Sequence, residues 1–351
     1  MSTDTIVRAA DASTVGFAKR ISSAPGFSAL RELVLLPVIG IVLIIGALIT
    51  PSFFTVNNLL NNVLVTGATL GLLVLAESII LICGYFDLSL QSTVGLAPML
   101  GGMLVVPAIS GGFGLQLPPW VGLVAMFVVG ALVGLVNGLL VGVLKLNAFM
   151  VTLATSILVA GLTLGISGGT TLTGLPDLYT LLGTTAILGV SIQVWILMIA
   201  FILAGLFMKY VSTGRKIYAT GGNLIAARSA GIKTTRLTVL VFVFGSLVAV
   251  FAGLLLSSRI ASVTANQGDG IIFTVFAAAV IGGISLDGGK GSMIGAFTGV
   301  VLLSLIQNIL TLSSVPSYWI NSVYGLIILA ALLIGQVPKL RGALNRRNSA
   351  S

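Results

Sequence analysis

Residues 119–144 read PWVGLVAMFVVGALVGLVNGLLVGVL, a run without a single charged side chain. An α-helix needs about 20 mostly apolar residues to cross the hydrocarbon core of a bilayer. The run exceeds that length and lacks the polar face that a helix on a soluble protein keeps toward water. It therefore predicts a membrane-spanning helix.

Similar apolar runs recur from residue 33 to residue 337, with no polar stretch between them long enough to fold separately. The same length criterion gives ten predicted helices. Their approximate bounds are 33–50, 59–82, 90–109, 119–144, 147–167, 190–208, 238–257, 271–286, 293–312 and 319–337. The sequence thus predicts an all-α integral membrane protein with a transmembrane domain, 33–337, and two tails, 1–32 and 338–351.

The composition agrees with a bilayer as the main solvent. Hydrophobic residues make up 57% of the 351 residues and charged residues 7%, whereas about a quarter of an ordinary soluble domain is charged. The net charge of +9 resides in short segments between apolar runs, which argues against a nucleic-acid partner. Cys83 is the only cysteine and histidine is absent. This excludes an intrachain disulfide, histidine-based catalytic triads and histidine-ligated zinc, and we expect no metal site.

The basic residues predict the orientation of the chain. Ten crossings place the segments 1–32, 83–89, 145–146, 209–237, 287–292 and 338–351 on one side of the membrane. These segments contain sixteen of the seventeen lysines and arginines and leave Arg259 alone on the other side. Because cytoplasmic loops carry the excess of basic residues, both termini and the long 209–237 loop are predicted to face the cytoplasm of a bacterial inner membrane.

A short motif occurs twice at an offset of 200 residues. The pattern D-x4-S-x2-G begins at Asp87 and again at Asp287. Transporters are often built from internal repeats, so the match suggests an internal duplication. Chance agreement in a chain rich in glycine and serine is the alternative.

Glycine occupies every fourth position of one predicted helix, at Gly130, Gly134, Gly138 and Gly142. Such a face has no side chains and lets another helix backbone approach closely. The interpretation we favour is a packing seam, and the alternative is a narrow path for a solute. Asn137 lies one residue from the seam and is expected to bond to a neighbouring helix.

Glu77 is the one acid well inside a predicted helix. A charge at that depth costs about 2.5–3.5 kcal/mol on the insertion scale, so the carboxyl group must be protonated, paired or hydrated. Coupling to protons is one function for it. A single acid without a second acid, lysine or histidine at similar depth is a poor relay, so a structural hydrogen bond is the favoured interpretation.

Neutral amides gather near the outer ends of two predicted helices. Asn57, Asn58, Asn61 and Asn62 begin the second helix, and Gln307 precedes Asn308 in the ninth. Amides both donate and accept hydrogen bonds, which suits a hydroxyl-rich neutral solute better than an ion. Capping and interhelical bonds are the alternative. The residues predicted to line a translocation pathway are Asn61, Asn62, Gln91, Asn137, Gln307 and Asn308.

The longest cytoplasmic loop contains GGNLIAARSAGI at residues 221–232. A glycine pair, an asparagine, alanines and a later glycine predict a turn, a short helix and a glycine C-cap. We expect a positive φ at Gly222 in the turn. The helix would give a partner protein a surface to hold, and a plain linker is the alternative.

These motifs resemble the permease subunits of ribose-type carbohydrate ABC importers. The most specific parts are the 221–232 loop and IGGISLDGGKGS at residues 281–292, followed by Gly295, which keep the order and spacing of that family. Such permeases usually read G-G-I-D-L-S followed by V-G-S where this chain has GYFDLS at residues 84–89. The sequence departs from the pattern at Tyr85, Phe86, Leu90 and Gln91.

The resemblance implies that residues 221–232, within the coupling loop 209–237, dock onto a separate ATP-binding subunit. The residues implied in coupling are Gly221, Gly222, Asn223, Ala226, Ala227, Arg228 and Gly231. It also implies a solute-binding protein outside the cell, a second permease copy or paralogue, and no cofactor on this chain, with ATP on the partner. The segment Gly288-Gly289-Lys290-Gly291 lacks the upstream glycine and the hydroxyl residue of a phosphate-binding loop. A secondary transporter or channel for a small polar solute is the alternative function.

Overall fold

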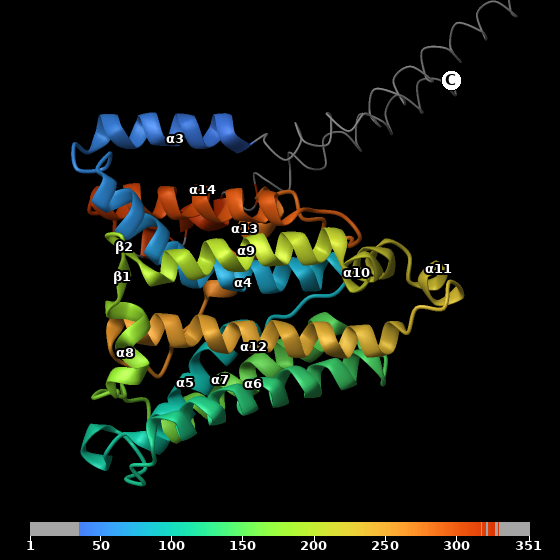
Figure 1. Cartoon of the computed structure of the whole chain (residues 1–351), viewed down its shortest axis with the longest axis horizontal. Coiled ribbons are helices and arrows are strands. Elements are labelled where there is room, and N and C mark those ends of the chain that lie inside the picture. Colours follow the sequence, from blue (N-terminus) through green and yellow to red (C-terminus); the bar gives the residue numbers. More distant parts are fainter. Residues whose placement is uncertain (1–34, 317, 321, 327–328, 330–351) are drawn as a thin grey trace, which may run out of the picture.

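The structure is a computed structural model that describes residues 35–316, 318–320, 322–326 and 329. The long helices lie side by side along one common direction (Figure 1). They are α3 (Leu35–Ile49), α4 (Leu64–Ile82) with a π-helical turn before it (Asn58–Val63), α5 (Leu90–Val105), α6 (Pro119–Gly142), α7 (Ala148–Ser167), α9 (Ile192–Tyr210), α12 (Thr234–Ile260), α13 (Ile271–Ile281) and α14 (Met293–Leu312).

Shorter elements join these helices at their ends. They are a 3₁₀ turn (Ala108–Ser110), α8 (Asp177–Thr184), β1 (Ala186–Ile187), β2 (Val190–Ser191), α10 (Ser212–Gly222) and α11 (Leu224–Ser229). The two strands pair antiparallel, with Ala186 opposite Ser191 and Ile187 opposite Val190. Leu188 and Gly189 connect them with positive φ values of 54° and 76°, as a two-residue hairpin turn requires.

The predicted all-α membrane fold is confirmed. Among the described residues, six helices are long and apolar enough to cross a membrane, and α3, α5 and α13 are shorter apolar helices. α4 lies at the centre, because 94% of its most apolar window is buried, whereas α7 and α9 bury only 28% of theirs. The tenth predicted helix, 319–337, lies mostly outside the described residues, as do the tails 1–32 and 338–351.

Two predicted helices are shorter than expected. The run 90–109 is helical only to Val105, and the run 271–286 ends at Ile281, before the glycine pair Gly282-Gly283. At about 1.5 Å per residue, α5 with 16 residues and α13 with 11 residues reach about 24 Å and 17 Å. Neither length spans a hydrocarbon core of about 30 Å. Non-helical segments, 83–89 before α5 and 261–270 before α13, lead into these helices.

These two segments are tolerated because the protein surrounds and bonds the parts of them that enter the bundle. Lipid offers no hydrogen bonds, so irregular backbone occurs at membrane depth only where protein or a cavity surrounds it. Leu88 and Ser89 in the first segment are buried, and so is Gln267 in the second. The Gln267 amide donates to the carbonyl oxygens of Val94 and Gly253, at 3.0 and 3.3 Å, and so fastens the second segment between α5 and α12.

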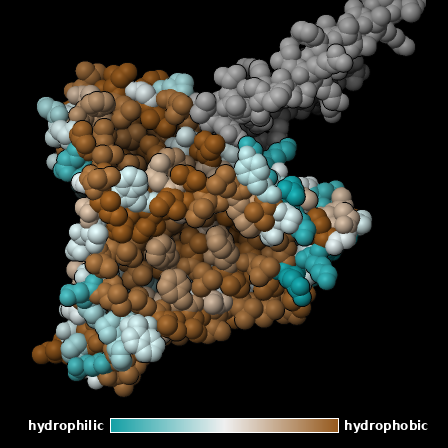
Figure 2. Space-filling model, viewed as in Figure 1, coloured by the Kyte–Doolittle hydropathy of each residue, from teal (hydrophilic) through white to brown (hydrophobic). Residues whose placement is uncertain are grey.

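The two ends of the helix bundle differ in charge. One end carries α10, α11, the connection between α6 and α7, and the turn between α13 and α14; the opposite end carries α8 and the hairpin (Figure 1). The segments predicted to be cytoplasmic within residues 83–292 therefore share one end. Eight of the nine lysines and arginines in the described part lie there: Lys145, Lys209, Arg215, Lys216, Arg228, Lys233, Arg236 and Lys290. Hydrophilic residues edge an otherwise apolar face at this end (Figure 2).

The glycine seam of α6 is confirmed as a packing surface against α12. A β-carbon at Gly134 would lie 2.6 Å from the Phe242 carbonyl oxygen, and one at Gly138 would lie 2.8 Å from the Val239 α-carbon. The backbone of α12 fills the space along the seam. The alternative of a solute path along this face is therefore wrong.

The repeated D-x4-S-x2-G motif adopts two different local structures. Asp87 is fully buried in the segment before α5, whereas Asp287 is exposed in the turn before α14. Ser92 lies inside a helix, whereas Ser292 is the N-cap of one. The matched letters thus do not mark equivalent positions, and an internal duplication stays a prediction.

We predict that Gly134→Ala lowers the stability of the folded protein, because the added methyl group meets backbone that cannot move aside. Overpacking of this kind typically costs about 1–3 kcal/mol. The matched control is Gly165→Ala on α7, where a β-carbon meets nothing within 4 Å. Melting temperatures in detergent should fall for Gly134→Ala and stay at the wild-type value for Gly165→Ala. Equal melting temperatures would contradict the seam.

A labelling experiment tests the orientation. Ile225 on α11 is 77% exposed and Leu188 in the hairpin is 89% exposed, and Cys83→Ser would remove the only native cysteine. In that background we predict that Ile225→Cys reacts with a membrane-impermeant maleimide only in inside-out vesicles, and that Leu188→Cys reacts only in right-side-out spheroplasts. The reverse pattern would invert the topology.

Candidate functional site

The basic end carries a pair of short helices in the 209–237 loop. α10 ends at Gly222, and the Asn223 side chain accepts a hydrogen bond from the Ala226 backbone N–H at 3.0 Å, which caps α11. Gly231 then takes a φ of +79°. The predicted short helix and glycine C-cap are therefore confirmed, whereas the glycine pair Gly221-Gly222, predicted to form a turn, ends the helix α10.

α11 presents one side to the protein and the other to its surroundings. Ala227 is buried, while Ile225, Ala226 and Arg228 are exposed. The Arg228 guanidinium donates through Nε to the Thr234 hydroxyl at 3.1 Å, so one of its faces is fixed to the start of α12. The exposed face is apolar at Ile225 and cationic at Arg228, which is a surface that a partner protein can grip.

Two turns meet the C-terminal end of α10 in a junction of glycines, which we call the glycine junction: Gly84, Gly221, Gly288 and Gly289. A β-carbon at Gly84 would lie 3.3 Å from the Gly221 α-carbon, and one at Gly288 would lie 2.9 Å from the Gly84 α-carbon. The Gly289 N–H donates to the Ile82 carbonyl oxygen at 2.9 Å. Gly84 and Gly288 have φ values of +90° and +81°, a region that glycine adopts without strain.

The two glycines that end α10 have different roles. A β-carbon at Gly221 would overlap the Ile82 carbonyl oxygen, whereas one at Gly222 meets nothing within 4 Å. Gly222 is the last residue of α10 and is not among the residues with positive φ. The expectation of a positive φ at Gly222 is therefore wrong, and Gly221 is the glycine that the close packing requires.

A further bond joins α10 to the turn that precedes α14. The Tyr218 hydroxyl donates to the Gly291 carbonyl oxygen at 2.8 Å, and Ile217 beside it is buried. α10 thus contacts both the turn that follows α4 and the turn that precedes α14. A displacement of α10 must move these turns or break the contacts.

The first of these turns leads directly to a buried polar chain in the protein interior. The Asp87 N–H donates to Glu77 Oε1 at 3.3 Å, and Asp87 Oδ1 accepts from the Ser89 N–H at 2.9 Å and the Ser89 hydroxyl at 2.6 Å. The Asn137 amide donates to Ser89 Oγ at 2.8 Å and its oxygen accepts from Thr155 Oγ1 at 2.7 Å. These bonds connect α4, the segment before α5, α6 and α7.

Glu77 is therefore not the only acid at its depth, and that expectation is wrong. Asp87 lies in a segment predicted to be a cytoplasmic loop, but the segment folds back into the protein and is fully buried. The structural interpretation of Glu77 is supported, because Glu77 Oε1 accepts from the Asp87 N–H. Residues 83–89 are not helical, so this N–H has no partner within a helix. The outer oxygens, Glu77 Oε2 and Asp87 Oδ2, have no hydrogen-bond partner among the described residues.

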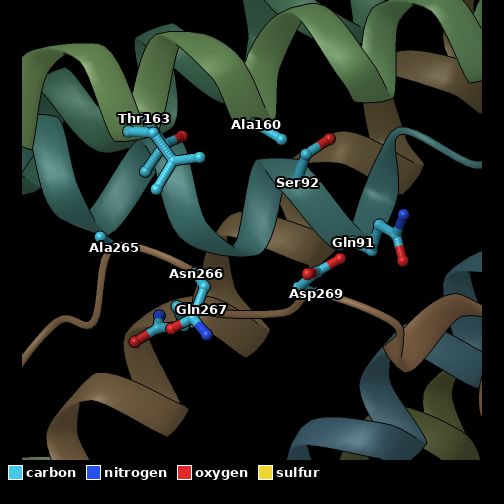
Figure 3. A pocket seen from close by; sticks show the side chains of 9 residues that line it. Gln91, Ser92, Ala160, Thr163, Ala265, Asn266, Gln267 and Asp269 are labelled. Atoms are coloured by element: carbon cyan, nitrogen blue, oxygen red, sulfur yellow. The ribbon is translucent and has the colours of Figure 1, made fainter. Parts of the chain in front are cut away.

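A small polar cavity lies where α5, α7 and the segment 261–270 meet. Its volume is about 90 Å³, and its lining includes Gln91, Ser92, Thr163, Asn266 and Asp269. Figure 3 shows Gln91 and Ser92 on α5, Thr163 on α7, and Asn266 and Asp269 on the segment between α12 and α13. The Gln91 amide donates to Ser156 Oγ at 3.2 Å, while Gln91 Oε1 is buried without a partner in the described chain.

Close backbone packing holds this cavity in shape. A β-carbon at Gly95 would lie 2.6 Å from the Gln267 carbonyl oxygen, and one at Gly268 would overlap the Gln91 carbonyl oxygen. The segment 261–270 is therefore pressed onto the first turns of α5. The polar side chains of Asn266 and Asp269 are exposed beside it.

The structure separates the six residues predicted to line a pathway. Gln91 lines the cavity, and Asn137 is buried in the polar chain. Asn308 exchanges two hydrogen bonds with Asn58, at 2.8 and 3.0 Å, and Asn62 donates to Asn58 Oδ1 at 3.1 Å.

The other two amides lie away from the cavity as well. Asn61 donates to the Gly189 carbonyl oxygen and accepts from the Ser191 N–H, at 3.2 and 3.3 Å, which joins the start of the α4 helix to the hairpin. Gln307 does not line the cavity. The alternative of interhelical bonds thus describes Asn58 and Asn308, while Asn62 bonds within its own helix and Asn61 bonds the hairpin.

Sequence reasoning missed Thr163, Asn266 and Asp269. The signal for two of them was present, because the polar stretch TANQGDG at residues 264–270 interrupts two apolar runs. Thr163 carries no such signal, since a threonine in an apolar helix usually bonds its own backbone. Here its hydroxyl does so, donating to the Val159 carbonyl oxygen at 2.8 Å.

Comparison with known proteins agrees with a membrane permease. The model of a family described as the permease component of branched-chain amino acid transport systems matches residues 59–332. The ribose import permease protein RbsC of Haemophilus influenzae is 32% identical over 297 residues, which cover 84% of this chain and 89% of that protein.

Two further relatives have similar coverage. The autoinducer 2 import system permease protein LsrC of Klebsiella pneumoniae is 33% identical over 302 residues, 86% of this chain and 85% of that protein. RbsC of Escherichia coli K12 is 31% identical over 298 residues, 84% of this chain and 90% of that protein. No solved structure matches the chain.

The role of Glu77 can be tested by two substitutions. Glu77→Gln keeps an acceptor for the Asp87 N–H, so we predict a melting temperature close to that of the wild type. Glu77→Leu leaves that N–H buried without a partner, which costs about 1–3 kcal/mol, so the melting temperature should fall. The control is Ser78→Ala, because the buried Ser78 hydroxyl has no partner among the described residues. A large fall for Glu77→Gln would show that the charge itself matters.

Proposed function

The chain belongs to the family of import-system permease components and is the membrane-spanning permease subunit of an ABC importer in the inner membrane, and we propose how it couples and what it carries. The glycine junction transmits the movement of an ATP-binding subunit to the segment before α5. The polar cavity at the other end of that segment is where the solute passes. The observation that carries the proposal is the close packing of two turns, at Gly84 and at Gly288-Gly289, against the end of α10 at Gly221.

The coupling step is mechanical. A partner that grips α11 through Ile225 and Arg228 moves α10, and α10 is packed without side chains against the turn at Gly84. From Gly84 the chain continues through Asp87 to α5, which lines the cavity. Interfaces packed this closely change between discrete arrangements rather than deforming gradually. The partner would have two conformations, each of which holds α10 and therefore α5 in a different position. If ATP binds one conformation more tightly, ATP binding selects the corresponding position of α5.

ATP is bound and hydrolysed on the partner in this proposal. The exposed face of α11 and its short length suit a docking helix, with Ala226 and Arg228 exposed on it. Asn223 and Gly231 cap the two ends of α11, Ala227 faces the protein, and Gly221 and the exposed Gly222 end α10 before it. This chain supplies no covalent step. Delivery by a solute-binding protein and pairing with a second permease copy complete the importer.

The cavity is closed to a solute in this structure. Its volume is only about 90 Å³. Ligand sites usually measure about 300–1,000 Å³. Passage therefore requires α7 and the segment 261–270 to move apart, and that movement is the state change that coupling would drive.

The lining favours a hydroxyl-rich neutral solute, as the ribose permeases among the relatives transport by name. Gln91 and Asn266 can each donate and accept, and Asp269 accepts, so together they match hydroxyl groups. No lysine or arginine lines the cavity, which disfavours an anionic solute. The family description names branched-chain amino acids, yet an amino acid would need a partner for its carboxylate.

The coupling step predicts different effects for the two neighbouring glycines. In the complex reconstituted with its ATP-binding subunit and binding protein, Gly221→Ala should lower solute uptake per ATP hydrolysed by about tenfold, because the methyl group pushes α10 away from Ile82. Gly222→Ala should leave that ratio unchanged, since its side chain meets nothing. Equal ratios for both variants would show that the junction does not transmit the movement.

The solute contact predicts a loss of uptake for Asp269→Asn. A hydrogen bond to a charged group contributes about 1.5–3 kcal/mol, which is about tenfold or more in an equilibrium or rate constant. Either the KM of the complex for the loaded binding protein should rise by that factor or the rate of solute transfer should fall by it. Asp177→Asn is the matched control, because Asp177 is an exposed acid at the same end of the bundle, at the start of α8. Normal uptake in Asp269→Asn would remove the cavity from the pathway.

A further inference from the structure

A groove on the outer surface of the bundle lies between α9, α10 and α14. Its volume is about 950 Å³, ten times that of the polar cavity. Phe201 and Ile202 of α9 and Ile294 and Phe297 of α14 form its apolar walls. Figure 2 shows the apolar surface over this face of the molecule. The lining runs along α9 from Met198 to Tyr210 and meets the first turn of α14, from Met293 to Phe297. Because these walls are apolar, we expect an apolar group to fill the groove when the protein is in a bilayer.

The end of the groove near α10 is cationic and hydroxyl-bearing. Lys209 and Arg215 line it there together with Tyr210 and Tyr218, and no acidic residue is among the lining residues. Lys209 is exposed, with its ammonium 5.2 Å from the centre of the Tyr210 ring. The groove thus joins an apolar channel to a pair of positive charges at one end.

α14 adds to the positive character of this end. The helix begins after Ser292, which also lines the groove. The first turn of a helix carries a partial positive charge from its aligned peptide groups. The two cations and the helix start therefore surround one corner, at the level where the apolar walls end.

The position of this corner matches that of phospholipid headgroups. The basic end faces the cytoplasm, and the cytoplasmic leaflet holds anionic lipids that attract basic residues. Basic pockets between transmembrane helices on that side are known to hold anionic headgroups. The lining on α9 runs from Met198 to Tyr210, a rise of about 18 Å at about 1.5 Å per residue. An acyl chain can lie along that wall, and the corner suits a phosphate.

We propose that this groove is a binding site for an anionic phospholipid of the inner leaflet, with an acyl chain between α9 and α14 and the phosphate against Lys209 and Arg215. A second copy of the chain is a poorer occupant. Two copies related by a two-fold axis along the membrane normal carry their cations at the same depth. Contact through this groove would bring Lys209 and Arg215 toward their own equivalents, with no acid in the lining to offset the repulsion.

The test is native mass spectrometry of the full-length chain in detergent, titrated with phosphatidylglycerol or with phosphatidylcholine of the same chains. We expect wild-type protein to retain phosphatidylglycerol at least fivefold more strongly. Lys209→Gln should lower that retention by about fivefold, the effect of one basic residue near an anionic lipid, and leave phosphatidylcholine unchanged. The control is Lys216→Gln, an exposed lysine on α10 that does not line the groove.

A second pair of variants tests the apolar part of the site. Gly205 lies in the groove wall, where a β-carbon would have only ordinary contact, 3.7 Å from Met293 Cβ. Gly205→Leu should fill the groove and abolish tight retention of both lipids, whereas Gly165→Leu on α7, where the surroundings are open, should not.

Three results would overturn the proposal. The first is equal retention of the two lipids by the wild type. The second is an equal loss of phosphatidylglycerol in Lys209→Gln and Lys216→Gln. The third is conversion of a dimer into a monomer by Gly205→Leu with lipid retention unchanged, which would assign the groove to a second copy.

Discussion

The structure depends on one constraint, which is that backbone N–H and C=O groups inside a bilayer must find partners within the protein. Most of the chain meets it with helices. The segments 83–89 and 261–270 are not helical, and buried side chains of the interior supply hydrogen bonds to them and hold them in place. Glu77 accepts from the Asp87 N–H, and Asp87 Oδ1 accepts from the Ser89 N–H and hydroxyl. The Gln267 amide donates to the carbonyl oxygens of Val94 and Gly253.

The same segments give the molecule its functional geometry. Because the chain is not helical between α4 and α5, it can pass beneath α10 at the glycine junction and still reach the centre of the bundle within a few residues. The hydrogen bonds that stabilise residues 83–89 inside the protein also fix where α5 begins. Gln91, in the first turn of α5, lines the cavity.

Much of the fold could be predicted from the sequence because apolar length is a direct physical requirement of the bilayer. The predicted bounds of α14, the seam facing α12 and the helix capped by Asn223 are all local or periodic features. The shortness of α5 and α13 could not be predicted, since apolar side chains cover a buried extended segment as well as a helix.

The candidate site was less accessible to sequence reasoning for a related reason. Gly221 and Gly222 are identical residues next to each other in the sequence. They differ only because the Ile82 carbonyl oxygen lies against Gly221 and not against Gly222. The contact of Asp87 with Glu77 depends on a chain reversal that no spacing encodes. Asn58, Asn61, Asn62 and Asn308 have the composition of a solute site, but the fold pairs them with one another or with the hairpin.

The most direct test of the account is solute uptake into proteoliposomes that hold the chain with its ATP-binding subunit and are supplied with loaded binding protein. We predict that uptake requires ATP on the side of the membrane that holds the ATP-binding subunit. Uptake should continue when an ionophore removes the proton gradient. Uptake by the chain alone that follows the proton gradient and ignores ATP would contradict it, and would give the buried pair Glu77 and Asp87 the role of a proton carrier.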